Sequence, residues 1–500
     1  MSYRTRRIQR TRRLRRVPVA AALGLLAVAV ACSDPPTSGG NADQVVVDEG
    51  GEVQLPECPL DALEAADGPT EITLWYGGIG GPVKDTMEQM VAGFNASQDD
   101  IVLTASDQGQ SYAEVFRKFE SAASADQSQL PDVVYLENTQ LQVLADSNLI
   151  LPAQSCMEAD GYDVTEIEPA VRSTYSVDDV LYPGYMNVSS QVLFYNKAHW
   201  ARAGLDPEDP PGTLQEVYEA AKALKAAGIP KPLSFKVSAS TLENWLSGEG
   251  VDVVDNGNGR EGPATAATFN TAEAVEALEL LQKMNEEGLL NPFANTEGGV
   301  DQFLALVTQD SSMLIETSTS SSAIAAALGG QLTPEDVGSD FDASVLDRTQ
   351  LVPGSGQFPG LTASGQVHAG GGAFFIVNAS EPAQQAASWK FLRYMLEPAN
   401  AKAWHIQSTY LPIVKSVSDE PDVQAFWQDS LAGVLVRVAV EQLQDADPDE
   451  PGPLIGPYID FADATEAAME AVLFDDADVA DALASAQEEV TASLERYGAE

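Results

Sequence analysis

Between Glu71 and Pro152, short apolar runs typical of strands alternate with segments whose apolar residues have the spacing of a helix face. Short apolar runs at Glu71–Tyr76 and Ile101–Ala105 have the length and composition of strands. Between them, apolar residues recur with the spacing of one helix face, at Met87, Met90, Val91 and Phe94. The pattern therefore predicts a strand, a glycine-rich loop, an amphipathic helix and a second strand.

The same pattern repeats directly afterwards. Ser111 and Glu114 form a capping box that predicts the start of a helix, and Asp132–Leu136 is a further apolar run. Short strands separated by single helices predict a parallel sheet covered on both faces. Ligands of such sheets bind beyond the carboxyl ends of the strands, which are expected at Tyr76–Gly81, Ser106–Tyr112 and Glu137–Gln140.

A second series of elements begins after Val180. The sequence after Val180 predicts a strand at Gln191–Lys197, a helix capped by Thr213 and a strand at Pro232–Val237. It also predicts a strand at Gly370–Val377 that begins with glycines. The Ser/Thr tract Thr317–Ser322 is open to two interpretations, a disordered spacer or a polar wall. The segment from Phe461 to Tyr497 is predicted to be helical throughout.

The amino-terminal residues predict export. Residues 1–31 hold eight arginines, no acid and the apolar run Val17–Val30, which together form a signal peptide. The small residues before Cys32 resemble a bacterial lipobox, so Cys32 is expected to carry lipid, the alternative being a plain secreted protein. Residues 32–57 are interpreted as a flexible tether. The protein is therefore expected at the outer face of the cell membrane, held there only by the lipid.

The other two cysteines are Cys58 and Cys156. An even pair in an exported chain predicts a disulfide that closes the first half of the chain on itself. Two free buried thiols are the alternative. No CxxC or Cys/His cluster occurs, so no metal site is expected.

The formal charge is −48, and removal of the eight leader arginines lowers it to −56. Such a surface repels nucleic acid and anionic lipid headgroups, so neither is expected as a partner. Salt adaptation or solubility explains the acidity as well as any specific partner does.

Four motifs carry a resemblance to a known family: the early Trp75-Tyr76 strand, the Phe194–Lys197 strand followed by Ala203–Pro207, the triple glycine Gly370–Gly372, and Thr409–Pro412. Together with the lipobox, they make the chain similar to family 1 extracellular solute-binding proteins of ABC importers. The resemblance is strongest to binders of glycerol 3-phosphate and glycerophosphodiesters, followed by sugar binders.

The resemblance implies an α/β fold of the two-lobed periplasmic-binding-protein type (type II), with two parallel-rich sheets joined by hinge crossings. The first lobe is expected at 58–186 plus 374–430, and the second at 187–372 plus 431–500. Hinges are expected near Tyr185–Ser190, Gly370–Ala373 and Leu431–Gly452. The implied partners are a small-molecule ligand and the membrane domains of the importer, and a monomer with no cofactor is expected.

The resemblance also implies the ligand-binding residues, to which a flat aromatic face is added. They are Tyr112, Glu137, Ser189, Ser190, Trp245, Ser318 (or Ser320), Gly371, Gly372 and Tyr410. Tyr112 and Trp245 could instead be core residues. Glu137 could instead be a solvated strand end, and Ser189 could instead have a purely structural role in the hinge.

Two departures from the glycerol-phosphate branch bear on the ligand. Lys236 and Ala239 replace its tryptophan pair, and Ala462 and Asp463 stand where it has an arginine that helps to bind phosphate. A neutral sugar, polyol, short oligosaccharide or glycerophosphodiester is therefore expected, with glycerol 3-phosphate as the alternative and Lys236 as its only obvious cation.

Two other classes of protein fit the sequence less well. An exported glycoside or phosphodiester hydrolase is disfavoured, because the chain has three histidines and neither GxSxG nor HExxH. Of these histidines, His368 is interpreted as an exposed loop residue. A repetitive all-β adhesion protein is disfavoured because no internal repeat is found.

Overall fold

The computed structural model describes residues 45–47, 53–296, 299–332, 346–347, 349–365 and 367–499. The predicted leader and Cys32 lie outside the described residues. Part of the predicted tether lies inside them, because β1 (Val46–Val47) pairs with β2 (Val53–Gln54). Val53 and Leu55 pack against the hydrophobic core, so the end of the predicted tether belongs to the folded protein.

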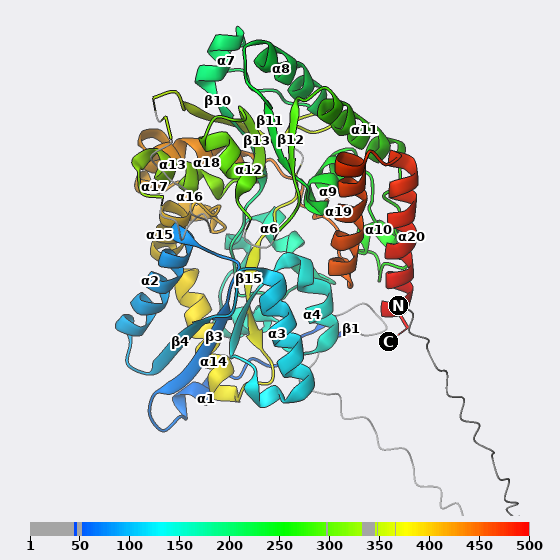
Figure 1. Ribbon diagram of the computed structural model, residues 1–500. Helices are drawn as coiled ribbons and strands as arrows, with labels where there is room; N and C mark the ends of the chain where they lie inside the picture. Colours follow the sequence, from blue (N-terminus) through cyan, green and yellow to red (C-terminus); the bar gives the residue numbers. More distant parts are fainter. Residues whose placement is uncertain are drawn as a thin grey trace, which may run out of the picture. The chain divides into compact units, whose positions relative to one another are not determined.

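The first sheet has the strand order β4-β3-β5-β15-β6, and β9 pairs with β15 (Figure 1). Its strands are β3 (Thr70–Tyr76), β4 (Ile101–Asp107), β5 (Val133–Glu137), β6 (Ile150–Leu151), β9 (Tyr185–Met186) and β15 (Gly372–Val377). As predicted, β3 pairs in parallel with β4 and β5. However, β15 is antiparallel to β5, β6 and β9, so the sheet is mixed. The reason is that β15 enters from the other half of the chain, at the end where β5 finishes.

Helices cover both faces of the first sheet. One side has α2 (Gly81–Ser97), α14 (Pro382–Met395) and α15 (Pro398–Ser408), and the other has α3 (Tyr112–Ala125) and α4 (Leu141–Ser147). Ser111 caps α3 as predicted, since its side chain accepts a hydrogen bond from Glu114 N. The remaining elements of this half are α1 (Asp61–Glu64), α5 (Ala153–Asp160), α6 (Pro169–Thr174), α16 (Lys415–Ser418), α17 (Pro421–Asp429), the hairpin β7 (Ser176–Val177) and β8 (Val180–Leu181), and the 3-10 helices η1 (Gln127–Gln129), η2 (Asn138–Gln140) and η3 (Val164–Glu166).

The second sheet has the strand order β12-β11-β13-β10-β14. Its strands are β10 (Gln191–Asn196), β11 (Leu233–Lys236), β12 (Leu290–Phe293), β13 (Met313–Thr317) and β14 (Pro353–Gln357). β11 pairs in parallel with β12 and β13, whereas β10 is antiparallel to β13 and β14. The tract Thr317–Ser322 is not a disordered spacer, because it ends β13 and begins α13 (Ser320–Gly329), whereas the polar wall stays a prediction.

The second sheet is also covered on both faces. α12 (Asp301–Val307), α13 and α18 (Leu431–Gln444) lie on one side, and α8 (Leu214–Ala226), α9 (Ala239–Gly248) and α11 (Ala272–Glu286) lie on the other. α7 (Lys197–Ala203) and α10 (Asp255–Asn258) complete this half. The segment predicted as continuous helix is instead two packed helices, α19 (Tyr458–Asp475) and α20 (Val479–Tyr497). Asp476 adopts a left-handed conformation with φ 54°, which ends α19.

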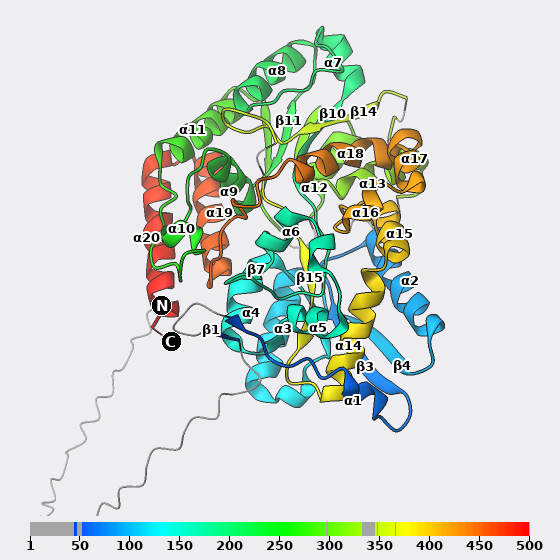
Figure 2. The ribbon, with the colours of Figure 1, turned by 180° about the vertical axis from the view of Figure 1, so that it is seen from behind.

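Two chain segments run side by side between the sheets. Asn187 N donates to Gly372 O at 2.7 Å, and Ser189 and Gly370 exchange two backbone hydrogen bonds. One segment leads from β9 to β10, and the other leads from β14 back to β15 (Figure 2). The predicted lobe boundaries and hinges stay predictions, but these paired segments are where a hinge would be built.

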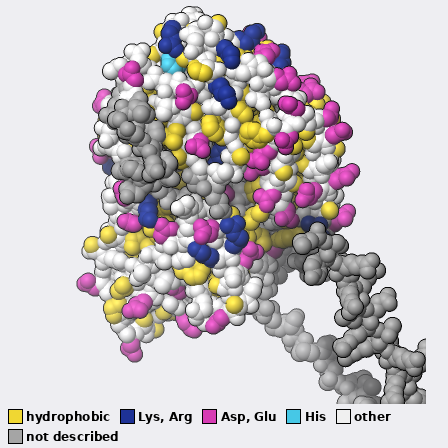
Figure 3. Space-filling view, in the orientation of Figure 1, with side chains coloured by type: hydrophobic (Ala, Val, Ile, Leu, Met, Phe, Trp, Pro, Cys, Tyr) yellow, Lys and Arg dark blue, Asp and Glu magenta, His cyan; other side chains and the backbone are white. Residues whose placement is uncertain are grey.

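Acidic side chains are frequent on the side of the molecule formed by α11 and α20 (Figure 3). This distribution accords with the strongly negative formal charge of the chain. Among the described residues, no helix combines the length and the apolarity needed to cross a membrane.

Candidate ligand-binding site

The glycines that open β15 allow a tyrosine to lie against the backbone. Gly372 is paired with Glu137, and a Cβ atom on Gly372 would lie 2.2 Å from the ring of Tyr135. Gly371 has φ 131°, and a Cβ there would lie 2.3 Å from Asn187 O. A side chain at either position would displace the groups around it, which explains why glycine is required.

Three tyrosine hydroxyls meet beside these glycines. The hydroxyl of Tyr112 lies 3.2 Å from that of Tyr135 and 3.4 Å from that of Tyr410. Asn187 Nδ2 donates to the Tyr135 hydroxyl at 2.8 Å. Burial raises the pKa of all three tyrosines, so they remain protonated donors at neutral pH.

Polar side chains hold the connecting backbone in place around this cluster. Tyr175 donates its hydroxyl hydrogen to Gly371 O at 2.9 Å. Asn138 Oδ1 accepts from Gly371 N at 2.8 Å. The Asn187 side chain is fully buried, and its Oδ1 has no hydrogen-bond partner among the residues that the structure describes.

Glu137 ends β5 and lies at the centre of the electrostatic interactions. Burial raises the pKa of its carboxyl, while the hydrogen bond from Thr139 and the positive charge of Lys236 lower it, and Glu466 raises it further. The negative charge of Glu137 also raises the pKa of Tyr112, Tyr175 and Tyr410. The carboxyl thus lies close to groups from both sheets.

The second sheet and its helices contribute a matching set of polar groups. Tyr458 donates to Glu243 Oε2 at 2.7 Å, and Glu466 accepts from the backbone N of Ala239 at 3.2 Å. Burial, followed by the charge of Glu137, raises the pKa of Glu243 to about 7, against a lowering effect of the Tyr458 hydrogen bond. Glu243 is therefore partly protonated at neutral pH and can donate as well as accept a hydrogen bond.

The raised pKa of Glu243 predicts a pH dependence. A carboxyl whose pKa is raised on folding stabilises the protein below its unfolded pKa, and this contribution is lost as the pH rises toward 7. We expect the wild type to lose about 2 kcal/mol of stability between pH 5 and pH 7 because of this group, and the Glu243→Gln variant to lack this loss. Urea denaturation at both pH values measures it, and parallel curves for the two proteins would contradict the raised pKa.

The structure places the predicted site residues in different environments. Tyr112, Glu137, Gly371, Gly372 and Tyr410 lie together in the cluster described above. Ser189 is hydrogen-bonded to Gly370, and its hydroxyl is partly exposed. Ser190 accepts from Gln442 at 3.0 Å, and Ser318 lies beside Ser190, but both serines are buried. Their hydroxyls join the crossing segment to α13 and α18.

Trp245 does not lie with this cluster. Its side chain has no exposed surface, stacks on Phe235 and donates its indole hydrogen to Pro359 O. The expectation of a stacking face at Trp245 is therefore wrong, and its core interpretation fits the structure. His368 lies in a loop and is half-buried rather than exposed, and burial lowers its pKa to about 4.

Sequence reasoning missed several members of the site. Tyr135 and Asn187 were missed because each lies in an apolar stretch in which a polar residue resembles a core position. Glu243 was missed because it stands among the buried residues of α9, where a polar residue gives no local signal. Glu466 lies in the segment Phe461–Tyr497, for which only a helix was predicted, and Tyr458 precedes that segment.

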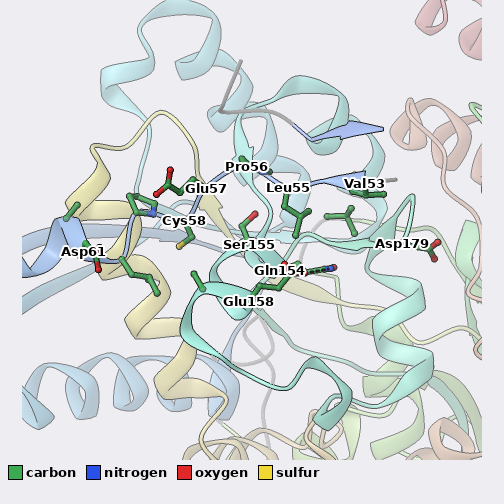
Figure 4. A pocket seen from close by; sticks show the side chains of 15 residues that line it. Val53, Leu55, Pro56, Glu57, Cys58, Asp61, Gln154, Ser155, Glu158 and Asp179 are labelled. Carbon is green, nitrogen blue, oxygen red and sulfur yellow. Dashed lines mark hydrogen bonds between the residues drawn. The ribbon is translucent and has the colours of Figure 1, made fainter. Parts of the chain in front are cut away.

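A cavity lies elsewhere in the first half of the fold. It measures about 880 Å³ and is lined by residues 53–62, α5 and the β8 hairpin around Cys58 (Figure 4). None of the residues of the tyrosine cluster lines it. Glu57, Asp61, Glu158 and Asp179 are at its rim and exposed. We place the candidate site at the tyrosine cluster instead, because polar groups from both halves of the chain converge there.

Comparisons with known proteins agree with this fold. The sn-glycerol-3-phosphate-binding periplasmic protein UgpB of Escherichia coli strain K12 is 25% identical over 375 residues, which cover 74% of this chain and 80% of UgpB. The cyclic alpha-maltosyl-1,6-maltose binding protein of Arthrobacter globiformis superposes with a TM-score of 0.65 at 24% identity, covering 86% of this chain and 100% of that chain.

A third similar structure is that of UgpB from Mycobacterium tuberculosis in complex with glycerophosphocholine, with a TM-score of 0.66, 19% identity, and coverage of 86% of this chain and 100% of that chain. These neighbours confirm the predicted two-lobed α/β fold. The model of the bacterial extracellular solute-binding protein family matches residues 89–430. The chain therefore belongs to the bacterial extracellular solute-binding proteins.

Proposed function

We propose that this protein captures a neutral sugar, polyol, short oligosaccharide or glycerophosphodiester between its two lobes and delivers it to the membrane domains of an ABC importer. The observation that carries the proposal is the convergence of the hydroxyls of Tyr112, Tyr135 and Tyr410 beside Glu137.

The chemistry of this cluster suits hydroxyl groups. A sugar hydroxyl both donates and accepts hydrogen bonds, so it can donate to the Glu137 carboxylate and accept from a tyrosine hydroxyl at the same time. Carboxylates such as Glu137 accept from paired hydroxyls. A ligand that touches Glu137 on one side and Glu243 on the other would favour the closed arrangement of the lobes. The lobe boundaries and hinges given above are part of this proposal.

Anchoring and assembly complete the proposal. The protein is exported through its leader and held at the outer face of the cell membrane by lipid on Cys32, and it acts as a monomer. Family membership supports export, while the lipid and the monomeric state rest on the sequence alone.

Glycerol 3-phosphate is the second candidate ligand. The name of the E. coli relative favours it. Against it, the positive charge of Lys236 already acts on two carboxyl groups, those of Glu137 and Glu466. A dianionic phosphate needs strong cationic hydrogen bonds, and Ala462 and Asp463 supply none.

A ligand screen combined with one substitution separates these candidates. We expect a neutral sugar or polyol to stabilise the protein by about 2.7 kcal/mol at 100 times its Kd, measured as a higher Tm. Lys236→Met should then change the affinity less than about tenfold. Lys222→Met, on the exposed surface of α8, is the matched control.

Two outcomes would overturn this expectation. Stabilisation by glycerol 3-phosphate alone, with binding lost in Lys236→Met but kept in Lys222→Met, would establish the phosphate ligand. Hydrolysis of a chromogenic glycoside or phosphodiester, without stabilisation by any ligand of the screen, would instead indicate an enzyme.

A further inference from the structure

The turn that follows α15 carries Tyr410 into the tyrosine cluster. α15 ends at Thr409, which adopts a left-handed conformation with φ 59° and ψ 17°. A β-branched residue rarely adopts a positive φ, because its Cβ then crowds the neighbouring backbone. Backbone strain of this kind persists only where the surroundings fix it, and it is typical of functional sites. The direction in which Tyr410 leaves α15 depends on this turn.

His405, one helical turn before Thr409, holds the backbone of Tyr410. The His405 side chain has no exposed surface. One ring nitrogen, Nδ1, lies 2.6 Å from Tyr410 O, and the other, Nε2, accepts a hydrogen bond from Trp427 Nε1 at 2.8 Å. The ring therefore joins the turn after α15 to α17, which packs against α15 (Figure 2).

Trp427 determines which nitrogen of His405 carries the hydrogen. An indole N–H group can only donate, so Nε2 must be the unprotonated acceptor. Nδ1 then carries the hydrogen and donates it to Tyr410 O. Burial lowers the pKa of His405 to about 4, against the raising effect of the backbone hydrogen bond with Tyr410. The ring is therefore neutral at neutral pH, as this pair of hydrogen bonds requires.

Tyr410 is also held by its ring and by the residue that follows it. The ring stacks on Trp404, with 6.3 Å between the ring centroids and 18° between the ring planes. Leu411 N donates to Val188 O of the crossing segment at 2.7 Å. At the far end of the side chain, the Tyr410 hydroxyl lies 3.4 Å from that of Tyr112. A shift of the Tyr410 backbone would therefore be transmitted to a hydroxyl of the candidate site.

We propose that His405 is a positioning residue of the solute-binding site. By donating from Nδ1 to Tyr410 O, in the tautomer that Trp427 fixes, it sets the position of the Tyr410 hydroxyl against the bound solute. This inference rests on the proposed function, because the position of Tyr410 matters only if Tyr410 contacts the solute. Solute affinity should then depend on a donor at the position of Nδ1, and not on the bulk of the ring.

Two substitutions separate the two hydrogen bonds of the ring. The amide group of asparagine reaches the position of Nδ1, so His405→Asn can still donate to Tyr410 O. The amide group of glutamine reaches the position of Nε2, so His405→Gln can still accept from Trp427 but cannot hold Tyr410 O. His199→Gln is the matched control, since His199 is a buried histidine of α7 outside the tyrosine cluster.

Calorimetric titration of the full chain with maltose, ribitol and glycerophosphocholine in turn first identifies a probe that binds the wild type. With that probe, we expect the affinity of His405→Gln to fall at least about tenfold and that of His405→Asn to stay within about threefold of the wild type. His199→Gln should bind as the wild type does. Equal affinities of the two His405 variants would overturn the inference, whether both bind normally or both are weakened.

If either His405 variant fails to fold, the ¹⁵N NMR spectrum of the histidine-labelled wild type decides, because the chain has three histidines to assign. We expect the Nδ1–H signal of His405 without the probe and a shift of this signal at saturation. An unprotonated Nδ1 or an unchanged signal would overturn the inference. If the wild type binds none of the three probes, the proposed function fails instead and the inference falls with it, a result distinct from equal binding by the variants.

Discussion

Replacement of both Cys58 and Cys156 by alanine is expected to lower the free energy of unfolding by about 4 kcal/mol. The structure confirms the predicted disulfide, and its two residues are separated by 98 positions. In the chain-entropy model, a closed loop of about 100 residues stabilises the folded state by up to about 4.7 kcal/mol. This loop contains β3, β4, β5 and β6, so the disulfide constrains four of the six strands of the first sheet.

Urea denaturation of the double variant and of the wild type measures this contribution. The wild type in strong reductant should approach the variant, which distinguishes loss of the bond from effects of the substitutions. Both cysteines are buried, so the alanines also leave a small cavity. A difference below about 1 kcal/mol would contradict the entropic account and would indicate that the reduced, unfolded chain retains structure.

Gly372→Ala is expected to remove solute binding. The added methyl group would overlap the ring of Tyr135, which has no exposed surface and cannot move aside freely. Tyr135 holds both Tyr112 and Asn187 through its hydroxyl, so displacement of the ring disrupts three polar groups at once. We expect affinity to fall at least about a hundredfold, with a loss of stability of about 1 to 3 kcal/mol from overpacking.

The solute identified by the thermal screen serves as the titrant for this variant. Gly498→Ala, at the end of α20, is the matched control, because a Cβ there meets only an ordinary contact with Leu494 O at 3.5 Å. Full binding by Gly372→Ala would show that Tyr135 is not part of the site. Loss of binding by the control as well would show that the effect is not local.

Local sequence signals predicted much of the fold. Period-two and period-3.6 patterns identified β3, α2 and β4, and the Ser111 and Thr213 caps predicted where α3 and α8 begin. These features depend on neighbouring residues. The antiparallel insertion of β15 could not be predicted from such patterns, because a fully buried strand has the same composition in either orientation. The left-handed Asp476 was missed because nothing in its acidic, alanine-rich surroundings resembles a helix end.

Only part of the candidate site could be predicted, because local patterns do not report tertiary packing. Tyr112 and Glu137 follow from the rule that ligands bind beyond strand ends. Trp245 was predicted to face the ligand because no residue of α9 is exposed. The helix therefore has no exposed face that would show which side meets the ligand. Glu243 and Tyr458 face Glu137 only through tertiary packing, which no local pattern reports.

The position of β15 has a consequence for how the chain acquires its structure during synthesis. Gly371 and Asn138 are hydrogen-bonded across 233 residues of intervening chain. Because the polypeptide is made amino-terminus first, β5 and β6 have no strand between them until almost three quarters of the sequence has been made. Long-range pairing of this kind slows folding. The first sheet therefore stays incomplete for most of synthesis, and its unpaired strand edges are then open to chaperones and proteases.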